Sequence, residues 1–533
     1  MGGRWIVLLC LLAAAPGVAA TPAAGRAVPF LDLIPAYEKA GKYRVLRNRT
    51  GNEAGLTVGG KPMRGLNCPA PSRIGFLLEG VFERMEIEVG VLQRGGGRGV
   101  TVRVLGDGRV LASTPPLFVG QQPVRLDFTL RNVVLLELVA EGPRGSRVVW
   151  GNGSLWGAKD RDLSLFRVAQ ERFSPRAYPS KFRRRVNQAI ERLILSLLAR
   201  QRKDGAWDQH GRAGNRDGMT ALVLLALLKG GVKADAPAIT RGFAYLKNRP
   251  FKRTYNVSIL LMALEAKYFP GGADEKDAHK KRPRLAKRVI SAGDREWMQE
   301  AADWLVAQQG AGYGQSRQRK FYPVWRYPSG GYDLSNTQYA LFGLAAANRC
   351  AIPTGRVWLP ALRFLLTVQE RHGPKVRVSR YVRSGRYLQR RVEDAEARGF
   401  TYTMTGKAYG SMTTAGICSL ILCQQALRRN AIFKSSLSKR TRTAIRDGLA
   451  WLEEYYDVNE NVLRGKTWWT YYLFNLERTG VLLNQRYLGT RDWYREGAEA
   501  LLPDVTRLAD LDQTFALLFL KRATVPALTD PLR

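Results

Sequence analysis

The sequence predicts a multidomain α and β protein, in which an N-terminal antiparallel β-sandwich is followed by an (α/α)6 toroid. Two patterns carry this prediction. Short runs that alternate apolar and polar residues between glycines fill residues 41–160, and six pairs of helical segments fill residues 185–525. One helical hairpin cannot bury its own apolar face, so repeated hairpins pack against their neighbours.

The segments around these two domains are expected to be a leader, two linkers and a tail. Residues 1–20 contain one basic residue, a short apolar run and a small-residue exit, which together predict a signal peptide. Residues 21–40 and 161–184 are predicted linkers, and residues 526–533 a tail. The mature chain is therefore expected in the periplasm, at the cell surface or outside the cell. No apolar run is long enough to cross a bilayer, so we expect no membrane span.

The chain is strongly basic, with a formal net charge of +39 at pH 7 from 84 Lys and Arg against 45 Asp and Glu. Such an excess attracts anionic partners. The basic residues are spread along the chain, with clusters at 276–288, 371–391 and 428–439, and no nucleic-acid-binding motif accompanies them. We expect an acidic or neutral polysaccharide, or another component of the cell envelope, as the partner, and no specific nucleic acid.

The N-terminal domain is predicted from alternation. Runs such as RMEIEVGV and VRLDFTL place apolar side chains at every second position. The turn signal Gly106-Asp107-Gly108 separates two further runs of this kind. Antiparallel strands packed as a sandwich account for this pattern.

Two sequence motifs in this domain resemble those of a known family. The segment from Gly65 to Ile74, which contains Pro-Ala-Pro-Ser-Arg-Ile, and the Val-Leu-Gly-Asp-Gly word at 104–108 resemble the NPCBM carbohydrate-binding modules. The resemblance implies a galactose-binding-like jelly roll that recognises glycan. Two places where that family usually has acidic residues hold Leu92-Gln93-Arg94 and Gly145-Ser146-Arg147 here, so ligands suited to a hard cation are missing.

Trp150 and Trp156 are the glycan-binding candidates of the β domain. An indole face can stack on a sugar ring. Both residues lie near a strand end, where the alternative is packing in the core. The domain then serves either glycan recognition or a structural, docking role.

The helical domain is predicted from six pairs of helices with different faces. The first members keep a polar face, whereas the second are apolar nearly all round, which predicts an outer ring around an inner ring. The first members begin near Val186, Ala238, Met298, Leu359, Ala444 and Trp493. The second begin near Gly218, Asn256, Asn336, Ser411, Thr470 and Asp512. Cys418 and Cys423 lie on one apolar member and are expected to be buried free thiols.

One motif in the helical domain resembles a known superfamily. Residues 201–207 (QRKDGAW) have the Gln-x-x-x-Gly-x-Trp spacing that repeats in squalene–hopene cyclases and protein prenyltransferase β subunits, and degenerate copies begin at Gln309 and Gly330. The resemblance implies the toroid. We expect Gln201 to bond across to a neighbouring helix end, Gly205 to permit a tight turn and Trp207 to stack on the next connector.

The chemistry of those enzymes is not expected here. Class II terpene cyclases protonate an alkene with an Asp-x-Asp-Asp motif, which this chain lacks. Protein prenyltransferases hold zinc with Asp, Cys and His, whereas the three histidines here, His210, His279 and His372, lie in polar connectors. Motifs therefore give catalysis no support, and we expect no metal and no cofactor.

The best candidate for a site is the end of the toroid where connectors lead from outer to inner helices. Six inner-helix N-termini meet there, and their N–H groups favour an anion. The connectors also carry many polar aromatic residues, whose alternative role is to pack the connectors. The ligand-binding candidates are Trp207, Tyr332, Asp333, Asn336, Tyr402, Tyr409, Trp468, Trp469 and Tyr471.

The function that these patterns favour is an exported binding or scaffold protein that recognises glycan or another envelope ligand. One alternative is a polysaccharide lyase or hydrolase that acts at the toroid mouth. Two carboxylates beside an open cavity would indicate a hydrolase, and a Tyr/Arg pair a lyase. Another alternative is a pseudo-cyclase that binds an isoprenoid or lipid in an apolar inner cavity.

Overall fold

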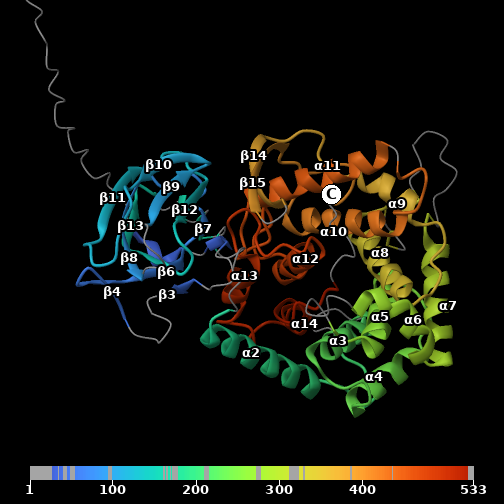
Figure 1. Cartoon of the computed structure of the whole chain (residues 1–533). Coiled ribbons are helices and arrows are strands. Elements are labelled where there is room, and N and C mark those ends of the chain that lie inside the picture. The colour runs from blue at the N-terminus through green and yellow to red at the C-terminus, as the bar shows by residue number, and fades with distance from the viewer. Residues whose placement is uncertain are drawn as a thin grey trace, which may run out of the picture. The chain divides into compact units, whose positions relative to one another are not determined.

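The chain divides into two compact units, of which the first contains strands β1 to β13 and the second helices α2 to α14 (Figure 1). A computed structural model describes residues 27–33, 35–39, 45–47, 55–93, 99–159, 162–163, 166–167, 170, 178–208, 215–271, 278–310, 323–327, 331–384, 387–434 and 436–525. The predicted signal peptide and the predicted tail lie outside these residues.

The first unit is built from two antiparallel sheets. One sheet has the order β11 (Val124–Thr129), β8 (Arg84–Gln93), β13 (Arg147–Trp156), β6 (Gly65–Pro69) and β3 (Leu46–Arg47), with β1 (Val28–Pro29) also paired to β13. The other has the order β10 (Arg109–Ser113), β9 (Thr101–Gly106), β12 (Leu135–Glu141), β7 (Ser72–Leu77) and β2 (Pro35–Lys39). A separate hairpin joins β4 (Leu56–Val58) to β5 (Lys61–Met63). The predicted antiparallel β domain is thus confirmed.

Both sheets contribute to one apolar core. Phe76 and Leu136 come from one sheet, Val89 and Trp150 from the other, and all four are buried in the same cluster. This is the consequence of the alternation seen in the sequence, because every second side chain of a strand points to the same face.

Two strands of this unit lie in the segment 21–40 that was predicted to be a linker. Val28 pairs with Leu155, and Pro35 pairs with Phe76. These strands are too short to show an alternating pattern by themselves, and their pairing partners are far away in the sequence.

The second unit contains the six predicted helix pairs. The apolar members are α3 (Arg216–Gly230), α5 (Thr254–Tyr268), α8 (Leu334–Arg349), α10 (Gly410–Leu427), α12 (Trp469–Leu482) and α14 (Asp510–Leu520). They contact one another in this order, and α14 also contacts α3. The amphipathic members are α2 (Ser180–Ala199), α4 (Pro237–Lys247), α7 (Ala292–Gln308), α9 (Trp358–Leu365), α11 (Ser436–Glu454) and α13 (Trp493–Leu501). Figure 1 shows these helices outside the apolar set.

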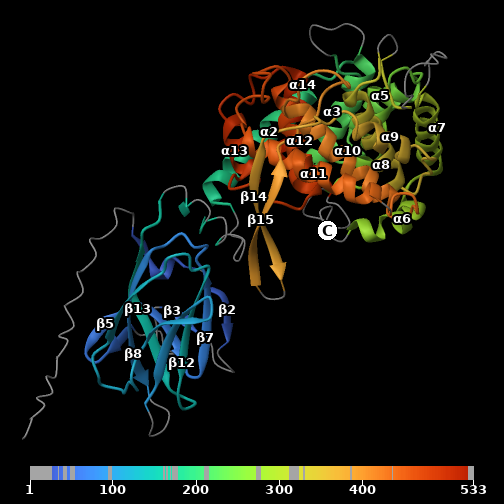
Figure 2. The same ribbon diagram turned by 90° about the horizontal axis from the view of Figure 1, so that it is seen from above.

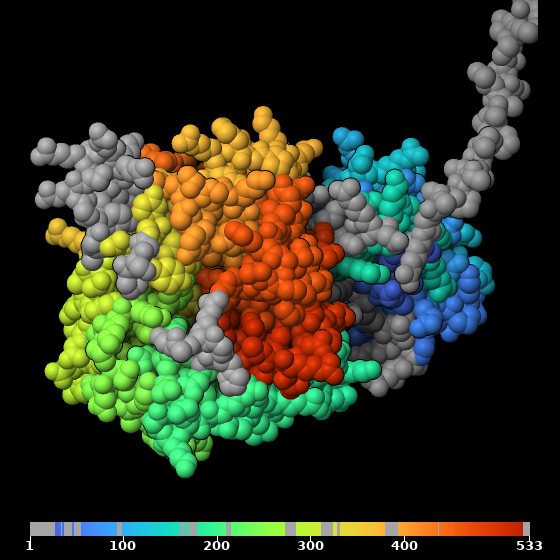
Figure 3. Space-filling model, turned by 180° about the vertical axis from the view of Figure 1, so that it is seen from behind, coloured from blue at the N-terminus to red at the C-terminus, as the bar shows by residue number. Residues whose placement is uncertain are grey.

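Burial explains the difference between the two sets. In α8 every residue from Leu334 to Ala347 is buried, whereas α2 buries one stripe that includes Val186, Leu193 and Leu197. The apolar helices approach closely, since a Cβ at Gly343 of α8 would lie 2.7 Å from the Cα of Ser258. In Figure 3 the chain follows this order around the packed surface of the unit, from green through yellow and orange to red.

Two elements outside the six helix pairs are absent from the sequence-based expectation. Helix α6 (Ala278–Val289) and the hairpin of β14 (Lys375–Ser384) and β15 (Tyr387–Glu396) occupy two of the basic clusters (Figure 2). In the first strand, Val376 and Val378 alternate with basic residues, which is a strand pattern that the charge of the segment obscured.

Cys418 and Cys423 are buried free thiols, as predicted. Burial raises the pKa of both thiols, so they are protonated and unreactive at neutral pH. None of the described helices is long and apolar enough to cross a membrane.

Candidate functional site

A cavity of about 710 Å³ opens at the N-terminal ends of the apolar helices. Each of these six helices contributes lining residues from its first turns or from the residue before it. They are Asn215 and Gly218 (α3), Thr254 and Tyr255 (α5), Ser335 and Asn336 (α8), Ser411 and Met412 (α10), Trp468 and Tyr471 (α12), and Leu511 and Phe515 (α14). The size is that of an ordinary small-molecule site.

A continuous row of aromatic rings lines this cavity. The ring centroids of Tyr327 and Tyr255 are 5.7 Å apart, and those of Tyr255 and Tyr339 are 4.5 Å apart. Tyr339 stacks on Tyr471 at 6.1 Å, and Tyr471 contacts Phe515 at 5.6 Å. Burial raises the pKa of Tyr255, Tyr339 and Tyr471, so their hydroxyl groups stay protonated. The row gives the cavity apolar ring surfaces, on which a sugar ring can stack, while the hydroxyl groups of Tyr255 and Tyr471 donate to Ser335 Oγ and Gln338 Oε1.

Asp333 stands behind this wall and holds the start of α8. It is only 2% exposed. Its carboxylate accepts hydrogen bonds from the Asn336 backbone N–H and side-chain Nδ2, each at 2.8 Å, and from Ser335 Oγ at 2.6 Å. The Tyr255 hydroxyl donates to Ser335 Oγ at 2.6 Å. Burial raises the pKa of Asp333, and the hydrogen bonds oppose that rise. Asp333 therefore acts as an N-cap that orients cavity residues.

Asn461 fixes the connector between α11 and α12. Its Oδ1 accepts a hydrogen bond from the Ser411 N–H at 2.8 Å, and its Nδ2 donates to the Thr467 carbonyl at 2.9 Å. Asn461 is fully buried. One side chain therefore caps α10 and also holds the loop that carries Arg464 and Trp468 to the cavity.

Trp468 is the most exposed aromatic residue of the lining, at 46%. It is the N-cap residue of α12 and adopts a left-handed backbone conformation, with φ of 57°. A bulky residue in this region is a conformational outlier, and such outliers gather at functional sites. The backbone turn presents the indole at the cavity instead of burying it among the helices.

The charged side chains of the lining are all arginines, namely Arg253, Arg326 and Arg464; within the described chain, no Asp or Glu lines the cavity. The Arg464 guanidinium lies 4.4 Å from the ring centroid of Tyr409. Burial raises the pKa of Tyr409, and Arg464 opposes that rise. The site is consequently positive.

Two amide groups complete the polar part of the cavity. The side-chain oxygens of Asn215 and Asn256 are buried, and neither has a hydrogen-bond partner within the described part of the chain. Both lie close to Gly218, where an added Cβ would be 2.4 Å from the Asn256 oxygen. Unpaired buried acceptors cost stability, and a ligand hydroxyl group would satisfy them.

The predicted site residues of the helical unit divide into three groups. Asn336, Tyr402, Tyr409, Trp468 and Tyr471 line the cavity. Asp333 lies one layer behind it, as described above. The remaining candidates of the helical unit, Trp207, Tyr332 and Trp469, pack elsewhere.

Local packing explains these three positions. The Trp469 indole donates to the Val458 carbonyl at 2.8 Å and lies under the Lys466 ammonium. Tyr332 packs edge-on against Phe364, with centroids 5.5 Å apart. Tyr332 and Trp469 therefore pack the connectors, which was the alternative role expected for these aromatic residues.

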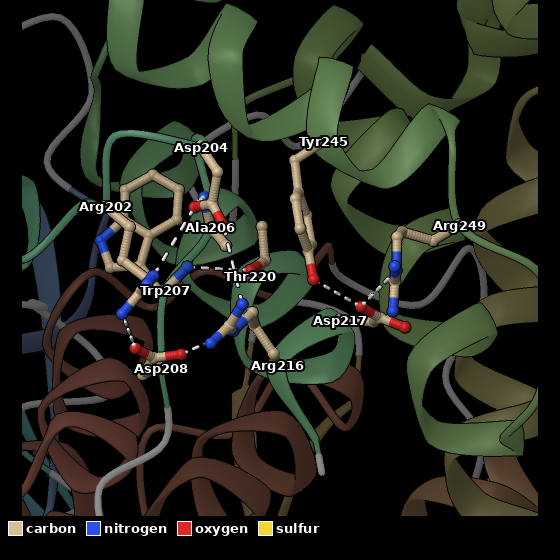
Figure 4. A network of polar contacts seen from close by, with 10 residues as sticks. All are labelled: Arg202, Asp204, Ala206, Trp207, Asp208, Arg216, Asp217, Thr220, Tyr245 and Arg249. Carbon is tan, nitrogen blue, oxygen red and sulfur yellow. Dashed lines mark hydrogen bonds and ion pairs between the residues drawn. The ribbon is translucent and has the colours of Figure 1, made fainter. Parts of the chain in front are cut away.

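Trp207 belongs to the joint between α2, α3 and α4 (Figure 4). Its indole donates to the Leu197 carbonyl at 2.7 Å, and its backbone N–H donates to Thr220 Oγ1 at 3.0 Å. Gln201 Nε2 donates to the Ala238 carbonyl at 2.8 Å, and Gly205 has φ of 89°. Gln201 and Gly205 thus have the predicted bond to a neighbouring helix and the predicted turn conformation, whereas Trp207 joins the helices through hydrogen bonds to Leu197 and Thr220.

Salt bridges extend this joint. Asp208 accepts from Arg202 and Arg216, each at 2.7 Å, and Asp217 accepts from Tyr245 at 2.9 Å and Arg249 at 3.1 Å (Figure 4). The acidic residues of the connector are therefore already paired with cations. Among the described residues, no group of three His, Cys, Asp or Glu side chains is arranged to hold a metal ion.

In the β unit, Trp150 is 1% exposed and belongs to the core. Trp156 is half-buried at the end of β13, with the Arg84 guanidinium 5.6 Å from its ring centroid. Of the two tryptophan candidates, the structure leaves only Trp156 with an accessible face.

Sequence reasoning missed the polar partners of the cavity. Arg253 directly precedes α5, Asn215 directly precedes α3, and Asn461 and Arg464 lie in the connector before α12. A residue at the start of an apolar helix is a usable signal, because the connector must place it at the mouth. The number of arginines elsewhere hid this signal.

Comparison with known proteins bears mainly on the β unit. Residues 27–156 match the family model described as NPCBM/NEW2 domain. No curated protein matches the chain. Among solved structures, CBM51 from Clostridium perfringens GH95 in complex with methyl-galactose is 18% identical, covers 24% of this chain and 99% of its own, and gives a TM-score of 0.23.

Two further structures are similar to longer parts of the chain. The CBM51-2 and INT domains of Clostridium perfringens ZmpB are 16% identical over 42% of this chain and 45% of that one, with a TM-score of 0.23. A rhamnosidase from Klebsiella oxytoca with rhamnose bound is 10% identical over 94% of this chain and 84% of that one, with a TM-score of 0.29. These scores are too low to support an argument about shape or activity. The family match, in contrast, confirms that residues 27–156 resemble a carbohydrate-binding module of the NPCBM/NEW2 type.

Proposed function

We propose that this protein is an exported glycan-binding protein whose helical unit is an (α/α)6 toroid with the ligand site at its mouth. The closed order of contacts among the apolar helices supports the toroid. The match of residues 27–156 supports a jelly-roll carbohydrate-binding module as the β unit. Export rests on the leader-like residues 1–20.

The observation that carries the glycan proposal is the aromatic row beside Trp468. Sugar rings bind on apolar faces while their hydroxyl groups bond to amide and hydroxyl groups. The cavity combines both features, since Tyr255, Tyr339 and Tyr471 line it together with Asn215 and Asn256.

The test replaces one tryptophan in each unit. We expect Trp468→Ala to weaken oligosaccharide binding by at least tenfold, measured by calorimetric titration, because the exposed indole on which a sugar ring stacks is lost. Trp468 is exposed, so the melting temperature should stay the same. Trp156→Ala is the matched variant in the β unit.

Each outcome has a distinct meaning. Loss of binding in Trp156→Ala alone would move the glycan site to the β unit. A melting-temperature increase with geranylgeraniol, together with none for any oligosaccharide, would instead favour the isoprenoid alternative.

A polysaccharide lyase is the second candidate, because the cavity holds the Tyr409–Arg464 pair and its described lining has no pair of carboxylates. Lyases break the bond at C4 of a uronic acid and leave a double bond that absorbs ultraviolet light. Activity would appear as rising absorbance, and Tyr409→Phe should abolish the rise while leaving binding in place. A hydrolase has no such support.

A further inference from the structure

The charge at the starts of the apolar helices is distributed unevenly. A helix N-terminus is positive and is normally compensated by an acidic residue. Helix α3 has Asp217 in its first turn, α8 has Asp333 as N-cap, and α14 has Asp510 and Asp512. Asp512 also accepts a hydrogen bond from Thr470 at the start of α12.

Helices α5 and α10 lack this compensation. Neither has an acidic residue in its first turn. Instead Arg253 is the N-cap residue of α5, and Arg464 lies on the ring of Tyr409, the N-cap residue of α10. Arginine at these positions adds positive charge where the helix is already positive, which is unfavourable without an anion.

The arginines also face the same space. Arg253, Arg326 and Arg464 all line the cavity, and Arg253 and Arg464 are exposed. The Asp333 carboxylate cannot compensate them fully, because it is buried and already accepts from Ser335 and Asn336. A planar guanidinium is well suited to bind a carboxylate or sulfate in a bidentate manner.

We propose that the cavity selects an anionic oligosaccharide, whose carboxylate or sulfate groups pair with Arg253 and Arg464 while its rings stack on Trp468 and the tyrosine row. This inference rests on the proposed glycan site and adds the class of ligand. It distinguishes the cavity from a site for neutral sugars.

The experiment compares ligands of equal size and different charge. The full chain is titrated with trigalacturonic acid, with its neutral methyl ester, and with a sulfated galactotriose, which carries sulfate groups and no carboxylate. We expect the acid or the sulfated probe to bind at least tenfold more tightly than the methyl ester, and the preference to weaken as salt is raised.

A double variant assigns the preference to the cavity. Arg253→Gln with Arg464→Gln should remove the preference while the melting temperature stays constant, because both side chains are exposed. The matched control is Arg356→Gln with Arg363→Gln, which removes the same charge from exposed positions outside the cavity lining. This control should keep the preference and so excludes a general effect of net charge.

The outcomes separate the two proposals. Equal binding of all three probes, or a preference retained in the cavity variant, would overturn the anionic class and leave glycan binding intact. If the acid, the ester and the sulfated probe all fail to bind, glycan binding at the cavity is itself wrong. Carboxylate and sulfate are distinguished by which of the two charged probes binds more tightly.

Discussion

The two ends of the helical unit are built from the same six helices and differ in almost everything else. The N-terminal end holds the cavity of about 710 Å³, whereas the C-terminal end encloses a void of about 40 Å³. Polar side chains fill the closed end in pairs. Glu265 binds Arg349 through two contacts of 2.5 and 2.7 Å, and Glu477 accepts from Thr524 Oγ1 at 2.7 Å.

The difference follows from the polarity of the helices. Carbonyl groups without partners gather where helices end, and cations satisfy them, as the Lys229 ammonium does for the carbonyls of Phe269 and Gly271. Residues 523–525 cover this end and line the small void. At the other end, the described residues leave a ligand-sized space with arginines in its lining. Polar groups thus pair within the chain at one end, whereas arginines line the ligand-sized cavity at the other, which is the end where we propose that the ligand binds.

The largest expected effect is a loss of stability when an ion pair of the closed end is removed. Arg349→Met removes both hydrogen bonds that the guanidinium donates to the buried Glu265 carboxylate and should lower the free energy of unfolding by about 3–5 kcal/mol. Denaturant titration measures this change. The control Arg356→Met removes an exposed arginine and should cost less than about 0.5 kcal/mol. Equal losses in the two variants would show that Glu265 is not sealed from water.

The next effect is a pH dependence at the same end. Burial raises the pKa of Glu477 to about 7. Because the folded state then holds this proton more tightly than the unfolded chain does, the stabilisation is present below the ordinary glutamate pKa of about 4.3 and is lost as pH rises towards 7.

Glu477→Gln removes this titration. Relative to the wild type, the variant should gain up to about 3 kcal/mol of stability between pH 5 and pH 8, measured by denaturant titration at each pH. A constant difference across this range would mean that Glu477 is ionised in the folded protein even at the lower pH.

The smallest effect concerns the open end. Gln201→Ala removes hydrogen bonds to the carbonyls of Gly205 and Ala238, and should cost about 1 kcal/mol. The control is Gln299→Ala, because the Gln299 side chain donates to Asp303 on the surface of the same helix, α7; this variant should stay within about 0.5 kcal/mol. If both variants match the wild type, the joint depends on Trp207 and not on the glutamine.

The helices were predictable because their apolar faces repeat locally. The predicted start at Gly218 lies two residues after the observed start of α3, and Thr470 lies one residue after that of α12. The strands β1 and β2 were missed, since their pairing with β13 and β7 depends on contacts far apart in the sequence. A local apolar pattern thus predicts a helix from the sequence, whereas a short strand that depends on distant pairing partners is not predicted.

The site was only partly predictable. The polar aromatics before each apolar helix pointed to the cavity end, and five of the nine candidates there line it. Asp333 was placed in the site because an acidic residue before a helix can either cap it or face a ligand, and only its hydrogen bonds with Ser335 and Asn336 separate the two roles. Arg464 could not be chosen among so many arginines without its contact to Tyr409.

The return of α14 to α3 has a consequence for how this architecture can vary. An open array of repeats can gain or lose a unit at its end, whereas an array whose last member meets its first has a fixed number of members. Insertions are then confined to the connectors between helices, and the unequal spacing of the helix pairs along the sequence agrees with this. Because those connectors carry Arg464 and Trp468, specificity can diverge while the scaffold stays constant.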